Sequence, residues 1–131
     1  MSSKVTRVNP AGLAVPRFPY TQTTASEAAG LLFISGQGPI DENGAPVGAT
    51  MEAQSRQVFK NLEAALIAHG CGFEDLLKLG IFLTDISKFA EFSRVREEYL
   101  KGVFPASTLV AGIRLVDPNW LVEVEAVAAL R

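Results

Sequence analysis

The chain has 131 residues, of which 48% are hydrophobic and 20% charged, a balance typical of one globular domain, expected here over residues 1–131. The formal net charge of −2 and the lack of a Lys/Arg cluster argue against a nucleic-acid partner, and no apolar run is long enough to cross a membrane. A single cysteine excludes an intrachain disulfide framework, a single histidine disfavours a His-rich metal site, and no signal-peptide core is present, so we expect a cytoplasmic protein without a metal.

The first part of the chain predicts short strands separated by loops. Alternating or Thr-rich sequence indicates the extended segments, and three prolines with one glycine indicate the first loop. In order, the segments are a strand at Lys4–Val8, a loop at Asn9–Pro19, an extended segment at Tyr20–Ser26, a strand at Leu31–Ser35 and a loop at Gly36–Thr50. A tight turn is expected at Asp41–Gly44, where Asp, Asn and Gly suit the backbone of a turn.

The rest of the chain predicts two helices and three strands. These are, in order, a helix at Met51–His69, a strand at Leu77–Leu83, a helix at Lys88–Lys101 and strands at Ser107–Leu115 and Leu121–Leu130, the last two joined by a turn at Asp117–Asn119. Thr50 can cap the first helix and Gly70 can end it, while Gln54 and Asn61 lie off its apolar stripe. The side chains expected to be buried are Val58, Phe59, Leu62, Ala65 and Leu66 on the first helix, Leu77, Leu79, Ile81 and Leu83 on the strand, and Phe89, Phe92, Val95 and Tyr99 on the second helix.

This order of elements predicts an α+β fold. Two strand–helix–strand units, with antiparallel hairpins at both ends, give a mixed sheet with both helices on one face. The other face would leave apolar side chains such as Phe33 and Leu109 without cover, and one chain offers no third layer. We therefore expect this face to meet another subunit.

The last strand carries two carboxylates among apolar neighbours. Strict alternation over Leu121–Ala128 places Glu123 and Glu125 on the same face of the strand. A carboxylate there must be solvated, paired or kept partly protonated, and the last of these suits a general acid or base. The alternative interpretation is an ordinary exposed strand face.

Three further residues could carry chemistry. Arg96 lies beside the apolar stripe of the second helix, where it can bury its stem or serve as an anion anchor at a subunit boundary. Cys71 follows a helix end without a base nearby in sequence, which favours a packed thiol over a nucleophile. His69 lies in the last helical turn, a favourable place for a cationic side chain.

A set of short motifs, in this order and spacing, resembles a known family over nearly the whole chain. The motifs are Pro19–Tyr20, Phe33–Gln37, Ala53–Val58 with Asn61 and Leu62, Phe104–Ala106 and Val122–Ala128. They resemble the reactive intermediate deaminase family, also called RidA, whose members are often labelled endoribonuclease L-PSP.

The resemblance implies a chorismate-mutase-like fold with a ferredoxin-like core of alternating strands and helices. It also implies a homotrimer with sites in clefts between subunits, and hydrolysis of enamine or imine intermediates such as 2-aminoacrylate to a keto acid and ammonia. No metal or organic cofactor is implied. By position, Tyr20 would line the cleft, Ser35 and Gly36 would form a small polar wall, and Glu123 would hold or activate the attacking water.

The chain departs from the family pattern at Ser107. Active members have an arginine after the Pro-Ala dipeptide, and that arginine pairs with the substrate carboxylate, whereas a serine cannot form a bidentate ion pair. Arg114 lies an odd number of residues along the same predicted strand and so would face the opposite side unless a bulge intervenes. Arg96 or Arg17, from this chain or a neighbour, could supply the anchor instead.

Three functions remain open at this point. The first is a deaminase-like hydrolase of small C–N substrates, with Glu123 as base and Ser35, Tyr20 or Ser107 orienting the substrate. The second is a non-catalytic binder of small ligands that has lost the carboxylate clamp. The third, an endoribonuclease, is the weakest because the chain is acidic and has no basic stripe.

Overall fold

The computed structural model describes residues 4–131, so residues 1–3 of the predicted domain lie outside the described part. The elements, with η marking short 3₁₀ helices, are β1 (Val5–Val8), β2 (Thr23–Ser26), β3 (Leu31–Gln37), α1 (Met51–Ile67), η1 (Phe73–Asp75), β4 (Leu76–Leu83), η2 (Ile86–Lys88), α2 (Phe89–Leu100), β5 (Ala106–Ala111) and β6 (Val122–Ala129). The strands and α-helices agree with the expectation from the sequence in number and order, whereas the two short 3₁₀ helices were not predicted.

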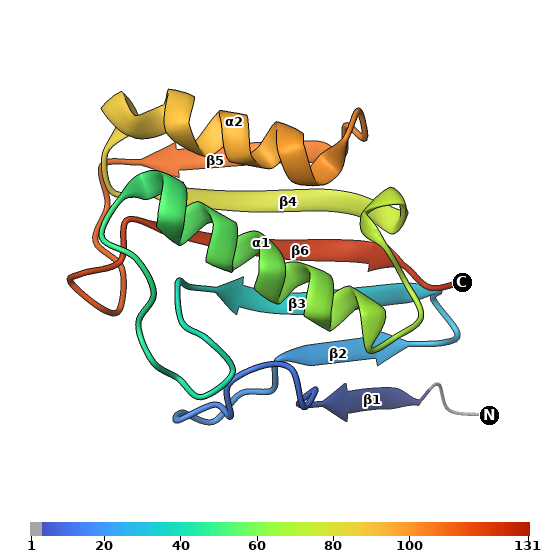
Figure 1. Ribbon diagram of the computed structural model, residues 1–131. Coiled ribbons are helices and arrows are strands. Elements are labelled where there is room, and N and C mark those ends of the chain that lie inside the picture. Colours follow the sequence, from blue (N-terminus) through green and yellow to red (C-terminus); the bar gives the residue numbers. More distant parts are fainter. Residues whose placement is uncertain (1–3) are drawn as a thin grey trace.

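The strands form one mixed sheet in the order β1-β2-β3-β6-β4-β5. β4 and β5 are parallel because α2 connects them as a crossover, and every other pair of neighbours is antiparallel. Both helices lie across the same face of the sheet (Figure 1). The predicted α+β fold with two helices on one face is therefore confirmed.

The predicted hairpin between the last two strands is wrong. β6 lies between β3 and β4, and β4 separates it from β5. The turn at Asp117–Asn119 forms, with an Asp117 carboxylate oxygen accepting from the Asn119 N–H at 2.8 Å, but it belongs to a longer connection that carries the chain to the sheet centre. β5 ends at Ala111 instead of Leu115 because Gly112 adopts a positive φ of 77°, which breaks the extended conformation.

The first helix begins and packs as predicted, with two exceptions. The Thr50 hydroxyl accepts from the Ala53 N–H at 3.1 Å, and the side chains of the predicted stripe are fully buried. Gln54 and Asn61, expected on the polar side, are also buried. Gln54 donates to the Asn119 carbonyl and accepts from the Leu121 N–H, at 2.9 and 2.7 Å, so its amide replaces backbone partners that the loop lacks.

Asn61 has the same role for a second loop. Its amide donates to the carbonyl oxygens of Gly38 and Ile40, at 3.1 and 2.8 Å. The two buried amides of α1 thus fix the loop that follows β3 and the loop that precedes β6. Both of these loops border the candidate site described below.

Two predicted core side chains lie at the surface instead. Leu77 is 47% exposed because a register shift between Leu76 and Lys78 moves Leu76 into the buried position. Phe89 is 38% exposed because it begins α2 at the edge of the layer. The rest of the predicted inward face of β4 is confirmed, with Leu79, Ile81 and Leu83 buried.

The face of the sheet opposite the helices carries apolar side chains. Phe33, 47% exposed, lies on this open face as predicted, together with Val110, 42% exposed. The residues that alternate with them, such as Ile34, point toward the helices and are buried. The prediction for Leu109 is wrong, because Leu109 pairs with the buried Ile81 and packs against the core on the helix side. No helix within residues 4–131 is long and apolar enough to cross a membrane.

Candidate functional site

A hollow in the described chain lies where the loop before β2, the end of β3 and the loop before β6 meet. Its volume is about 650 Å³. Its walls include both aromatic and charged side chains. Those used below are Arg17, Tyr20, Ser35, Gly36, Trp120 and Glu123.

An irregularity in β3 shapes the floor of this hollow. Ile34 faces Ala126 and Gln37 faces Val124 on β6, so the pair Ser35–Gly36 stands opposite a single residue. Two residues against one define a β-bulge, which re-aims side chains locally. The bulge brings the Gly36 backbone against Glu123, since a Cβ on Gly36 would lie 2.0 Å from Glu123 Oε2. Only a glycine leaves room for the carboxylate in this position.

Glu123 is partly buried beside a second negative charge. Loss of solvent raises the pKa of its carboxyl above the ordinary value, and the charge of Glu125, two residues along the same face, raises it further. Glu125 itself is exposed and lies against Gly80, where a Cβ would approach the Glu125 side chain to 2.8 Å. The two carboxylates share one face of the strand but differ in environment, since Glu123 is partly buried and Glu125 is exposed.

The hydroxyl of Ser35 has a fixed orientation. It donates to the Thr21 carbonyl at 2.7 Å, and the Ser35 N–H donates to the Gln22 carbonyl at 2.9 Å. Since a serine has one hydroxyl hydrogen, Oγ is left with its lone pairs for a ligand. Ser35 is thus an acceptor in the hollow, and its geometry does not favour nucleophilic attack.

Two buried glutamine side chains hold the wall behind Ser35. The Gln37 amide donates to the Gln22 side-chain oxygen at 2.8 Å and to the Ser35 carbonyl at 3.0 Å. The Gln22 amide donates to the Ala14 carbonyl at 2.8 Å. This chain of hydrogen bonds fixes the loop before β2 onto the bulged end of β3.

Tyr20 enters the hollow from a tight turn. The Tyr20 N–H donates to the Phe18 carbonyl at 2.7 Å, which closes a three-residue turn over Pro19. Proline suits the centre of such a turn because its ring fixes φ near the required value. Tyr20 is 46% exposed, so its ring and hydroxyl are accessible to a ligand.

The other two predicted site residues lie elsewhere in the chain. Ser107 and Arg96 line a second hollow of about 420 Å³ between α2 and β5. Ser107 pairs with Leu79, whose side chain is buried under the helices, whereas Glu123 pairs with Phe82 on the open face. One chain therefore brings Tyr20, Ser35, Gly36 and Glu123 together and leaves Ser107 and Arg96 apart from them.

Arg96 is held against α2. Its guanidinium carbon lies 5.8 and 5.5 Å from the ring centres of Phe89 and Phe92, and its Nη2 donates to the Ser93 hydroxyl at 3.3 Å. Arg114, a further candidate anchor, lies beyond the end of β5 and is exposed. Of the three arginines considered from the sequence, only Arg17 lines the hollow of Glu123.

Trp120 also lines the hollow. Its ring lies over Gly38, where a Cβ would come within 2.4 Å of ring carbons. Its indole N–H is buried and has no hydrogen-bond partner within the described residues. The sequence offered only a glycine-rich loop and a single tryptophan as signals for this contact. That the tryptophan ring packs on Gly38 depends on the fold.

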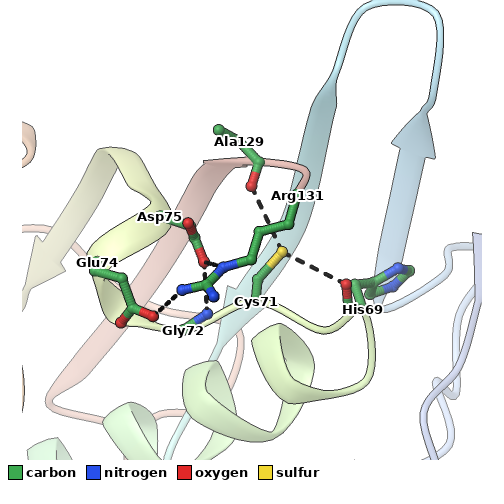
Figure 2. A network of polar contacts seen from close by, with 7 residues as sticks. All are labelled: His69, Cys71, Gly72, Glu74, Asp75, Ala129 and Arg131. Carbon is green, nitrogen blue, oxygen red and sulfur yellow. Dashed lines mark hydrogen bonds and ion pairs between the residues drawn. The ribbon is translucent and has the colours of Figure 1, made fainter.

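Cys71 and His69 lie at the opposite end of β6 from Glu123. Figure 2 shows Cys71 buried beside the carbonyls of His69 and Ala129, with Sγ distances of 3.6 and 3.5 Å. His69 Nε2 is 2.9 Å from the Thr23 hydroxyl, and burial lowers the pKa of the imidazole. These contacts connect the segment after α1 to β6 through Cys71 and to β2 through His69.

The same end of β6 is fixed by Arg131. Its guanidinium pairs with Glu74 and, at 2.8 Å, with Asp75, whose carboxylate also accepts from the Gly72 N–H (Figure 2). Hydrogen bonding from that N–H and the nearby Arg131 charge hold the pKa of Asp75 below its usual value. Across residues 4–131, no group of three or more His, Cys, Asp or Glu side chains is placed to hold a metal ion.

Comparisons with known proteins agree with this architecture. A family model described as endoribonuclease L-PSP matches residues 12–130. A RutC family protein from Aquifex aeolicus is 40% identical over 116 residues, which cover 87% of this chain and 90% of that protein.

Two solved structures are similar over almost their full length. A protein of the Rid family called YyfA, from Yersinia pestis, has a TM-score of 0.90 and 31% identity, covering 97% of this chain and 100% of that one. TdcF from E. coli, solved with bound serine, has a TM-score of 0.87 and 25% identity, covering 96% of this chain and 99% of that one.

Proposed function

This chain belongs to the endoribonuclease L-PSP family, also called RidA, and from that premise we propose that it hydrolyses small enamine or imine substrates and releases ammonia. One observation carries the proposal. The Glu123 carboxylate lies in a hollow, over a glycine, with its pKa raised by burial and by Glu125. A carboxyl group with a raised pKa gives up its proton less readily than an exposed carboxyl. Once ionised, the resulting carboxylate is a stronger proton acceptor.

The reaction needs only water and proton transfers. Glu123 takes a proton from a water molecule as the water oxygen bonds to the electrophilic C=N carbon, and the C=N electron pair moves to nitrogen. The proton held by Glu123 passes to this nitrogen and gives a neutral tetrahedral carbinolamine. Glu123 then takes the proton of the carbinolamine hydroxyl and delivers it to nitrogen as the C–N bond breaks and the C=O group forms, so the products are a carbonyl compound and ammonia.

Ser35 and Tyr20 supply orientation. Because its hydroxyl hydrogen is used by the Thr21 carbonyl, Ser35 Oγ can accept from the N–H of an imine or iminium group. This contact strengthens as the nitrogen is protonated and gains positive charge, so it assists the departure of ammonia. The accessible hydroxyl of Tyr20 lies in the same hollow and can contact a polar group of the substrate.

We further propose a cytoplasmic homotrimer in which the two hollows of neighbouring subunits meet. The open face of the sheet carries Phe33 and Val110 without a covering layer, and an interface would bury them. Ser107 and Arg96, which lie apart from Glu123 within one chain, would then contribute to a site from a second subunit. A single domain over residues 1–131 is part of the same proposal.

A small-ligand-binding protein without catalysis is the second candidate. The serine at position 107 favours it, because the arginine that the family places there would pair with a substrate carboxylate. Ribonuclease activity is the weakest candidate, since net charge −2 and the absence of a basic stripe give little attraction for a phosphate backbone.

Ammonia release from freshly generated imines of several amino acids tests the first candidate against the second. On a substrate that the natural protein hydrolyses, Glu123→Gln should lower turnover by about 10²-fold or more while keeping a similar shape. Glu125→Gln, on the same face but outside the hollow lining, should leave turnover largely unchanged. Equal rates for Glu123→Gln and the natural protein would remove the catalytic assignment.

The pH dependence gives an independent check. Turnover should fall as pH decreases through a pKa above 4.5, the ordinary value, because protonation removes the base. Stability should change in the opposite direction. Folding raises the pKa of Glu123, so the folded chain binds this proton more readily, and stability is lost as pH rises above 4.5 through the folded pKa. Glu123→Gln should therefore raise the unfolding temperature at neutral pH and have little effect at pH well below 4.5.

A further inference from the structure

Arg17 is the cationic side chain of the Glu123 hollow. The other ionisable groups in its lining are Tyr20, Asp117 and Glu123. Within residues 4–131, the carboxylates that lie within 4.0 Å of a cationic side chain pair with Arg56, Lys88 or Arg131, and Arg17 has no such partner. Its guanidinium is therefore available for an anionic ligand.

Local structure directs this side chain toward the hollow. Arg17 lies between Pro16 and the tight turn over Pro19, and the Gln22 amide holds the preceding segment through the Ala14 carbonyl at 2.8 Å. The guanidinium lies over Gly44, with Nη2 3.8 Å from the place where a Cβ would project. Gly44 has a positive φ of 80°, so a residue with a side chain would have a strained backbone there.

The charge pattern of the hollow assigns a ligand chemistry. A guanidinium can form two parallel hydrogen bonds to a carboxylate, whereas Glu123 and Asp117 repel one. A ligand whose carboxylate is bonded directly to the C=N carbon would satisfy both charges by orienting its carboxylate to Arg17 and its reactive carbon to Glu123. A neutral imine would lack the first contact.

Resting on the function proposed above, we propose that Arg17 binds the carboxylate of a 2-imino acid in the hollow of Glu123, a contact that Ser107 cannot make. Arg17 then determines specificity, because it selects anionic substrates without taking part in the proton transfers. The keto acid product carries the same carboxylate and should bind at the same place. Arg96, packed against Phe89 and Phe92 beside the other hollow, is the competing anchor.

The first experiment measures binding and does not depend on turnover. 2-Oxobutyrate is titrated into the full-length protein, and affinity is measured by calorimetry or NMR for the natural protein, Arg17→Ala, Arg17→Lys, Arg96→Ala and Arg94→Ala. Arg94 is exposed on α2 outside both hollows and is the matched control. We expect Arg17→Ala to weaken binding by about 10-fold or more, Arg17→Lys to restore part of the loss, and Arg94→Ala to have no effect.

The second experiment measures ammonia release from a carboxylate-bearing imine and from a neutral imine without a carboxylate. Arg17→Ala should raise KM for the first by a similar factor, change its kcat little, and leave the neutral imine unaffected. Unchanged binding and KM in Arg17→Ala, or a loss confined to Arg96→Ala, would overturn the assignment. Arg17 is exposed, so circular dichroism should show the variant folded.

The two proposals fail in different ways. Binding of 2-oxobutyrate that depends on Arg17, without ammonia release from any imine, would support the anchor and reject the hydrolase. Ammonia release that is insensitive to Arg17→Ala would support the hydrolase and reject the anchor. A natural protein that neither binds 2-oxobutyrate nor releases ammonia rejects both.

Discussion

A single methyl group at position 36 should separate catalysis from folding. In Gly36→Ala the new Cβ would lie 2.0 Å from Glu123 Oε2 and 2.9 Å from its Cδ, whereas real Cβ atoms essentially never approach other atoms within 3.0 Å. The carboxylate must therefore move away by about 1 Å, which is the difference between the 3.0 Å limit and the 2.0 Å separation from Oε2. A displacement of this size in a reacting group can cost about 10²-fold in rate, so we expect a loss of that order in ammonia release.

Stability should change much less than activity in this variant. Gly36 does not have a positive φ, so alanine is compatible with its backbone, and restriction of the unfolded chain contributes about 0.4–1 kcal/mol in favour of folding. Crowding acts against this by about 1–3 kcal/mol, and the contacted atoms belong to the end of a partly exposed side chain that can rotate. The net destabilisation in denaturant unfolding should be between about 0 and 2.6 kcal/mol.

Gly12→Ala is the matched control for Gly36→Ala. Its Cβ would meet Ala64 Cβ at 3.4 Å, an ordinary contact, and Gly12 lies outside the hollow lining and has no positive φ. We expect both turnover and stability to stay close to those of the natural protein. The reasoning would be refuted if Gly36→Ala retained natural turnover while a structure of the variant showed the Glu123 carboxylate displaced.

Two other predictions concern assembly and the departure from the family pattern. Light scattering at micromolar concentration should give the mass of a trimer, and Phe33→Glu, on the open face, should shift it toward monomer; a monomeric natural protein would contradict the proposed assembly. Ser107→Arg should increase turnover of carboxylate-bearing imines, most clearly in an Arg17→Ala background where the proposed anchor is missing. No gain in that background would show that position 107 does not reach the substrate.

The local structure of this chain was predictable because it depends on neighbours in sequence. The apolar stripe of α1, its Thr50 cap and its end near Gly70 follow from helical periodicity and terminal residues. The alternation that places Glu123 and Glu125 on one face is likewise a property of any extended segment. These regularities were enough to predict the α+β class and to single out the strand of Glu123.

Errors appeared where a residue's surroundings depend on distant segments. Gln54 and Asn61 are polar side chains on a helix, but unpaired loop carbonyls draw both into the interior. Leu77 is apolar in an alternating strand, but a shift in pairing with β6 gives its place to Leu76. In both cases long-range hydrogen bonding overrides local periodicity.

The candidate site shows the same division. The resemblance selected Tyr20, Ser35, Gly36 and Glu123, and the sequence alone determined which face of its strand Glu123 occupies. Only the tertiary structure decided that β6 lies beside β3, that a bulge places Gly36 under Glu123, and that Arg17 shares their hollow while Ser107 does not. The physical reason is that strand order and register are set by hydrogen bonds and packing between segments far apart in the chain, which periodicity within one segment does not encode.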